Sequence, residues 1–202
     1  MIVGITGATG IIYGVRLLEA LKELGIERHL VLSKAAEITR AYETSFGASD
    51  IRALADFAYS PNDIGAPIAS GSFKTMGMIV APCSIRTLSD IAHGTTSGLI
   101  SRAADVVLKE RRRLVLLVRE TPLHSGHLKS MLAVSEMGGI IAPPVPAFYT
   151  KPSSVEDIVA QTIGRALDLF DLDLSSIPRW GGPKSTWAAV ERELSGIDDA
   201  AE

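Results

Sequence analysis

Polar side chains follow three short apolar runs of this 202-residue chain. The first run ends in Gly7-Ala8-Thr9-Gly10, the second in Ser33-Lys34, and the third in Pro82-Cys83-Ser84-Ile85-Arg86-Thr87. Backbone N–H groups, hydroxyls and guanidinium groups gathered in such loops are suited to binding a phosphate group. Tight turns and a helix cap at Ser84 would produce the same residue types. The loops by themselves leave both interpretations open.

A dinucleotide is disfavoured as the phosphate-bearing ligand. The first loop has the spacing Gly4-x-x-Gly7-x-x-Gly10, which differs from the G-x-G-x-x-G spacing of dinucleotide-binding proteins. Those proteins also place an acidic residue after the second strand, where it holds a ribose hydroxyl. Here that position reads Ser33-Lys34, which argues against NAD.

Three further groups of side chains have a chemical and a structural interpretation. Arg102 and Lys109 are seven residues apart, so they share one face of a predicted helix and could converge on a single anion, unless that face is simply solvated. The single cysteine, Cys83, could be a nucleophile, but a lone cysteine beside an apolar run is more often a small buried hydrophobic residue. His124 and His127 have no Cys or carboxylate companion, so we expect no metal site.

The elements that must position these residues alternate between short apolar runs and helical patterns. Strands are predicted near residues 2–6, 29–32, 78–81, 114–118 and 140–142, and helices near 12–24, 34–45, 87–93, 99–112, 127–137 and 155–170. This order predicts an α/β fold: a doubly wound, Rossmann/flavodoxin-like parallel sheet with helices on both faces. Its polar loops would share one rim of the sheet.

The boundaries of the domain follow from the same pattern. Residues 1–170 are expected to form a single α/β domain, and residues 171–202 a tail that is either disordered or packed on a neighbouring subunit. Ser153 and Glu156 have the spacing of a capping box that would open the last helix.

Composition restricts the class of partner. A net charge of -3 predicts no broad attraction to nucleic acid or to an anionic membrane. No apolar run approaches the roughly 18–20 residues of a membrane span, and a single cysteine fits a reducing compartment. We therefore expect a cytoplasmic protein.

Several segments together resemble the UbiX-like flavin prenyltransferases, in particular the branch associated with hydroxyarylic acid decarboxylase operons. The resemblance extends from about Ile2 to Trp180 and rests on specific motifs. These are Thr6 to Gly10 with Tyr13 to Leu18, Ser33 to Ala36, Ser101 to Val106, Leu108 to Arg112, Arg119 to Leu123, and Pro143 to Tyr149. Any one of these motifs alone would be a weak signal, but the combination is specific.

The resemblance implies a metal-independent enzyme that joins the dimethylallyl group of dimethylallyl phosphate to N5 and C6 of reduced FMN. The prenylated FMN would serve a partner UbiD-like aromatic acid decarboxylase. FMN would be bound by Gly7, Ala8, Thr9, Ser33, Ser84, Ile85, Arg86, Thr87 and Arg119. Tyr149 and Arg165 would bind the allylic phosphate, with Arg102, Lys109 and Glu120 around it and Glu43 and Trp180 as further catalytic candidates. The family also implies a homododecamer in which Trp180 closes a neighbour's site.

Two departures and two rival functions accompany this resemblance. Thr9 stands where the family commonly has Ser, and Ile85-Arg86 stands where many members have small residues.

A flavin-dependent cysteine decarboxylase would carry Asn in the third loop, which has none here. An FMN-binding accessory subunit could lose the phosphate-binding set, whereas Lys109, Glu120, Tyr149 and Arg165 are all present.

Overall fold

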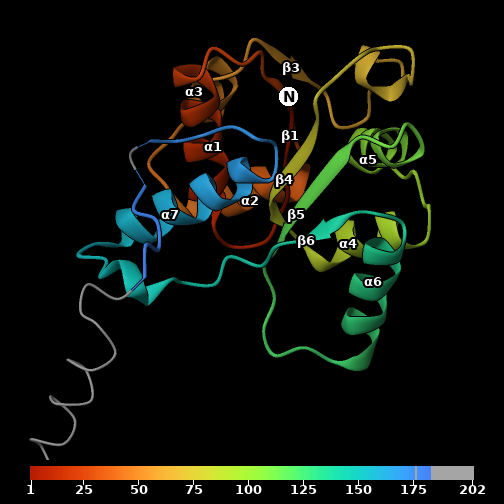
Figure 1. Cartoon of the computed structure of the whole chain (residues 1–202). Coiled ribbons are helices and arrows are strands. Elements are labelled where there is room, and N and C mark those ends of the chain that lie inside the picture. Colours follow the sequence, from red (N-terminus) through yellow and green to blue (C-terminus); the bar gives the residue numbers. More distant parts are fainter. Residues whose placement is uncertain (176, 183–202) are drawn as a thin grey trace, which may run out of the picture.

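A six-stranded, fully parallel sheet forms the centre of the computed structural model (Figure 1), which describes residues 1–175 and 177–182. The strand order is β3-β2-β1-β4-β5-β6, so the order reverses between β1 and β4. The strands are β1 Ile2–Ile5, β2 His29–Leu32, β3 Phe57–Tyr59, β4 Gly77–Cys83, β5 Arg113–Val118 and β6 Ile140–Ile141. The doubly wound parallel sheet predicted from the sequence is confirmed.

Helices cover both faces of the sheet (Figure 1). One face carries α1 Ile11–Glu23, α2 Lys34–Glu43, α3 Ala48–Ala53 and α7 Val155–Asp168. The other carries α4 Ile85–Ala92, α5 Leu99–Lys109, α6 Ser125–Glu136 and the short helix η1 Pro67–Ala69. A second short helix, η2 Phe148–Thr150, lies between β6 and α7. In the described part of the chain, no helix has the length and apolar character needed to cross a membrane.

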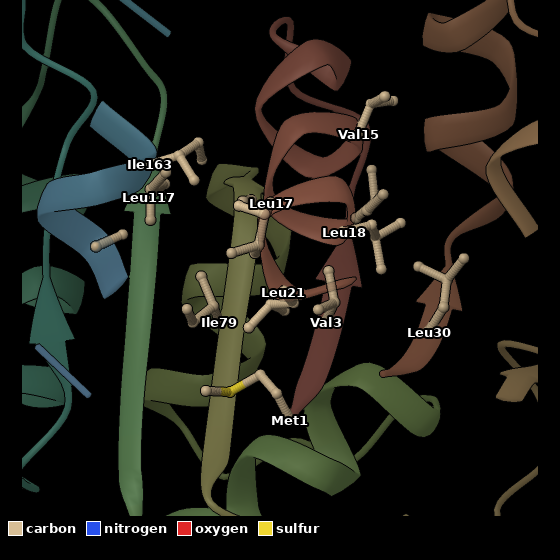
Figure 2. Close-up of a cluster of buried hydrophobic side chains, with 14 of the residues drawn as sticks. Met1, Val3, Val15, Leu17, Leu18, Leu21, Leu30, Ile79, Leu117 and Ile163 are labelled. Atoms are coloured by element: carbon tan, nitrogen blue, oxygen red, sulfur yellow. The ribbon is translucent and has the colours of Figure 1, made fainter. Parts of the chain in front are cut away.

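The central strands contribute side chains to two hydrophobic cores, because successive side chains point to opposite faces of the sheet. On β4, Ile79 and Ala81 join the core under α1 and α7, whereas Met78 and Val80 join the core under α4 and α5. Figure 2 shows Leu17 and Leu21 of α1 beside the central strands that carry Val3 and Ile79. Burial on both faces explains why these strands are apolar at nearly every position.

The structure corrects the sequence analysis at three places. The short edge strand β3 and the six-residue helix α3 were not predicted. The last helix is capped by Ser154 with Asp157, not by Ser153 with Glu156. The helix predicted to reach residue 112 ends at Lys109, because Arg111 adopts a left-handed backbone with φ 56° and the chain turns there into β5.

Helix α1 approaches the sheet closely at Gly14. A Cβ atom at this position would lie 2.5 Å from Cδ1 of Ile5 and 2.6 Å from the backbone oxygen of Ala81. The second neighbour belongs to the backbone of the central strand β4, so it cannot move aside as the end of a side chain can. The absence of a side chain at Gly14 therefore sets the distance between α1 and the two central strands.

We expect Gly14→Ala to destabilise the protein by about 1–3 kcal/mol, the usual cost of forcing extra atoms into a packed core. The measurement is the thermal unfolding midpoint at a fixed protein concentration. Gly65→Ala is the matched control, because a Cβ there would meet nothing closer than Asp63 Oδ1 at 3.5 Å. Equal midpoints for the two variants would contradict the close approach.

Candidate functional site

The loops that follow β1 and β4 are joined by the buried hydroxyl of Thr6. Thr6 Oγ1 donates to the carbonyl of Pro82 at 2.8 Å and accepts the Ser84 N–H at 2.7 Å. The Thr6 N–H donates to the same carbonyl at 3.2 Å. These contacts lie at the carboxyl ends of the strands where the strand order reverses, which is where doubly wound sheets bind ligands.

A cavity of about 190 Å³ opens at this point of the sheet. Its lining includes five of the residues expected to bind FMN: Gly7, Ser33, Ser84, Arg86 and Thr87. We call it the rim pocket. Lys34, which was predicted to lie at this rim, also lines the pocket. The rest of the lining was not predicted and consists of Ala35, Pro61, Asn62, Asp90, Ser97, Gly98, Ile100 and Ser101. Ala8 and Thr9 continue the first loop, and Ile85 lies between Ser84 and Arg86 at the start of α4.

The first loop offers backbone donors, whereas the N–H groups of Gly10 and Ile11 at the start of the next helix are already bonded. Within the described residues, the N–H groups of Gly7, Ala8 and Thr9 have no hydrogen-bond partner. The next two, those of Gly10 and Ile11, donate to the carboxylate of Glu43 at 2.8 and 3.0 Å. Glu43 thus occupies the N-terminus of α1. An anion at this rim would therefore meet the loop itself and the N-termini of α2 and α4.

The hydroxyl groups of the rim cap these two helices and still carry protons to donate. Ser33 Oγ accepts the Ala36 N–H at 3.0 Å at the start of α2, and Ser84 Oγ accepts the Thr87 N–H at 3.4 Å at the start of α4. Ser84 also donates to Thr87 Oγ1 at 3.2 Å. Because a hydroxyl both accepts and donates, Ser33 and Thr87 keep an O–H that can point at a ligand oxygen.

Arg119 and Glu120 leave β5 beside the same loops. The Arg119 N–H donates to the Cys83 carbonyl at 3.1 Å, which fixes the end of β5 against β4. Burial raises the pKa of Tyr13, and the positive charge of Arg119 opposes that rise. Glu120 is exposed and accepts only the N–H of Thr121 among the described residues, at 3.0 Å.

A second pocket of about 210 Å³ contains Arg165 and lies between the end of β5, the chain after β6, and α7. Its lining is Leu117, Ala142, Pro143, Val145, Ala147, Gln161, Thr162, Arg165, Ala166 and Leu169. Tyr149 is linked to it through Gln161, whose Nε2 donates to the phenol oxygen at 3.3 Å. The expected pair Tyr149 and Arg165 therefore gathers around one pocket, which we call the α7 pocket.

The chain after α7 folds back beside Tyr149. Arg179 forms a bidentate ion pair with Asp168, at 2.7 and 3.0 Å, and Asp168 also pairs with Arg165. These two guanidinium groups, that of Arg179 foremost, lower the pKa of Asp168. Trp180 meets the Tyr149 ring edge-on at 5.6 Å. Within the described residues Arg179 and Trp180 thus contact their own chain. That residues 171–202 pack on a neighbouring subunit stays a prediction, and residues 183–202 of this tail lie outside the described part.

Arg102 and Lys109 lie away from the α7 pocket. Lys109 ends α5 four residues before β5 begins, so it lies at the amino ends of the strands, about 12 Å along the helix from Ser101 in the rim pocket. It pairs with Glu110 at 2.6 Å. Arg102 pairs with Asp105 at 2.7 Å and donates to the Ala69 carbonyl at 3.2 Å. Within one chain, the two cations hold separate neighbours and do not converge on one anion.

Cys83 is completely buried, and burial raises the pKa of its thiol far above the ordinary value. This supports its interpretation as a core residue. His124 and His127 stack with ring centroids 3.6 Å apart. The described residues include no cluster of three or more His, Cys, Asp or Glu side chains suited to a metal ion.

The chain is similar to characterised proteins over most of its length. It matches the flavoprotein family over residues 1–167. It is 56% identical to a flavin prenyltransferase UbiX of Neisseria meningitidis, covering 90% of this chain and 96% of that protein. The structure superposes with a TM-score of 0.90 on AnUbiX (PadA1) in complex with FMN and dimethylallyl pyrophosphate, at 55% identity over 91% of this chain and 97% of that one. A dodecameric FMN-dependent UbiX-like decarboxylase from Escherichia coli O157:H7 gives a TM-score of 0.88 at 54% identity, covering 90% and 98%.

We expect the thiol of Cys83 not to react with Ellman's reagent in the native protein, since it is buried and uncharged at neutral pH. After denaturation one thiol per chain should react, because the sequence contains one cysteine. Absorbance of the released chromophore measures both states. Rapid stoichiometric labelling of the native protein would restore Cys83 as a candidate nucleophile.

Proposed function

The chain belongs to the UbiX group of flavin prenyltransferases within the flavoprotein family, and we propose that it transfers a dimethylallyl group from an allylic phosphate to reduced FMN. The observation that carries this proposal is the presence of two separate donor sets, one in each pocket. The rim pocket presents hydroxyls and N–H groups, and the α7 pocket contains the Arg165 guanidinium together with Gln161, which holds the phenol of Tyr149.

The residues of the rim pocket fit a flavin mononucleotide. A Cβ at Gly7 would lie 2.5 Å from the Cβ of Ala35, so the missing side chain lets the first loop pass against α2 with its N–H groups uncovered. The hydroxyls of Ser33 and Thr87, with the charges of Arg86 and Arg119, can bind a phosphate that carries two negative charges. Lys34 supplies a cation where a dinucleotide site would place an acid.

The α7 pocket fits the leaving group of an allylic phosphate. As the C–O bond breaks, negative charge accumulates on the phosphate, and preorganised cations and hydrogen-bond donors stabilise that charge more than they stabilise the substrate. Arg165 can supply the charge and the Tyr149 hydroxyl a hydrogen bond. Reduced FMN would supply the nucleophilic N5 and the C6 carbon at which the new ring closes.

Lys109 and Arg102 can join this reaction only from another copy of the chain, because in their own chain they lie away from the α7 pocket. We therefore propose the same kind of homo-oligomer as the E. coli relative, a dodecamer in which α5 of one subunit faces the α7 pocket of the next. In that arrangement Lys109 would exchange its ion pair with Glu110 for the substrate phosphate.

Two carboxylates and one aromatic ring complete the proposed site. Glu120 is exposed at the rim beside Arg119 and is our candidate for the proton transfers that accompany ring closure. Glu43 holds the first loop through its two backbone contacts, so we assign it a positioning role. Trp180 offers an aromatic face that would stabilise an allylic cation.

The prenylated flavin would serve as the cofactor of a second enzyme. We propose that this enzyme is a UbiD-like aromatic acid decarboxylase and that both proteins work in the cytoplasm. A single cysteine, which suits a reducing compartment, supports this location.

The direct test is to mix the purified protein anaerobically with reduced FMN and dimethylallyl phosphate or diphosphate, then weigh the extracted flavin. We expect a flavin heavier by one dimethylallyl unit, with the two allylic substrates compared at equal concentration. The control is the same mixture without the protein. Unmodified flavin in every mixture would leave an FMN-binding accessory subunit as the better description.

Arg119 and Arg165 form a matched pair of variants for separating the two pockets. Arg119→Ala should weaken FMN binding by about tenfold to a hundredfold, because one charge-assisted hydrogen bond to the cofactor is lost. Arg165→Ala should keep the FMN dissociation constant within about twofold and raise the KM for dimethylallyl phosphate by about tenfold or more. FMN fluorescence titration and steady-state kinetics measure the two quantities. The opposite pattern would exchange the roles of the two arginines.

A further inference from the structure

Gln161 lies in the core-facing side of α7. Within α7, all of which the structure describes, it is the only buried residue with a polar side chain, and it is 4% exposed. Burying a primary amide costs free energy unless the amide forms hydrogen bonds. The contact that Gln161 makes is therefore informative about its role.

That contact is with the hydroxyl of Tyr149. Gln161 Nε2 donates to the phenol oxygen at 3.3 Å, and no other described residue hydrogen-bonds this hydroxyl. Tyr149 comes from the short turn η2 and is half exposed, so few neighbours restrain it. Trp180 contacts the ring edge-on. Gln161 is thus the group that orients the hydroxyl of Tyr149.

The direction of this hydrogen bond decides what the phenol can do. A tyrosine hydroxyl accepts through oxygen and donates one proton. Because Gln161 donates to the oxygen, the O–H proton remains available for a different acceptor. Gln161 and Arg165 are one helical turn apart and line the same pocket. The Tyr149 hydroxyl is therefore held at the same stretch of α7 as the Arg165 guanidinium, which is largely exposed and pairs with Asp168.

We propose that Gln161 is a positioning residue that keeps Tyr149 as a hydrogen-bond donor to the allylic phosphate. This inference rests on the proposed function and adds a residue to it. Gln161 would act only through Tyr149, since its own amide oxygen is buried and has no hydrogen-bond partner among the described residues. A neutral amide suits this role, because a carboxylate at the same position would accept the phenol O–H as a hydrogen bond and place a negative charge beside the phosphate.

A double-mutant cycle tests the proposal with Gln161→Met, Tyr149→Phe and the double variant. Methionine has a similar length and is unbranched, so it should preserve packing while removing the hydrogen bond. The measured quantities are the dissociation constant of dimethylallyl phosphate by calorimetry on FMN-free protein, its KM and kcat, and the FMN dissociation constant. Thermal unfolding reports on the fold of each variant.

We expect Gln161→Met to raise the dissociation constant and KM for dimethylallyl phosphate by about threefold to tenfold, with FMN affinity unchanged. In the Tyr149→Phe background the same substitution should have no further effect, because the hydroxyl on which Gln161 acts is absent. The positioning role would be overturned if Gln161→Met raised the dissociation constant by the same factor in both backgrounds, or had no effect with Tyr149 present.

Gln161→Glu provides a second cycle if the methionine variant does not fold. The loss of phosphate affinity caused by Gln161→Glu should be greater with Tyr149 than in the Tyr149→Phe background, since only the former has a phenol O–H that the new carboxylate can draw away from the phosphate. Equal losses would overturn the inference. Formation of prenylated flavin by the parent protein distinguishes failure of this inference from failure of the proposed function. If the parent is active but the Gln161 substitution has equal effects in the two backgrounds, only the role of Gln161 is refuted. If the parent neither binds dimethylallyl phosphate nor modifies flavin, the proposed function is refuted as well.

Discussion

The hydroxyl of Thr6 fixes the place from which the rest of the site is built. It bonds to the end of β4 through the Pro82 carbonyl and to the chain just after β4 through the Ser84 N–H, at the point where the strand order reverses. A buried backbone group that lost such a partner would be costly to leave unpaired. The first loop and the start of α4 therefore keep a fixed separation, and a ligand that needs donors from both finds them already in place.

Much of the fold could be predicted because the central strands are buried on both faces. His29–Leu32 is a continuous buried strand, and its bounds agree with the sequence prediction. The edge of the sheet gave no comparable signal: β3 has three residues, and two of them are exposed. The cap of α7 shows a different limit. Ser153, Ser154, Glu156 and Asp157 allow several pairings, and only backbone geometry decides that Ser154 and Asp157 form the box.

The site was predictable where its residues follow strands. Ser33 and Ser84 come directly after apolar runs, and parallel strands must bring such loops to one rim. Asn62 and Ser97 reach the same pocket from loops without a motif. Gln161 resembles any polar helix residue until its burial is known. For Lys109, spacing along a helix reveals a shared face with Arg102, but it does not reveal at which end of the sheet the residue lies.

Glu43 has a consequence for the kinds of cofactor this scaffold can accept. The positive end of a helix dipole attracts anions, and in dinucleotide-binding sheets the first helix holds a pyrophosphate there. In this chain the carboxylate of Glu43 already neutralises that end of α1 by accepting the N–H groups of Gly10 and Ile11. A bridging pyrophosphate would meet electrostatic repulsion at that position, whereas a mononucleotide can place its single phosphate farther along the rim. Redesigning the scaffold for a dinucleotide would thus have to begin on α2, at a residue 33 positions from the glycine whose amide it holds.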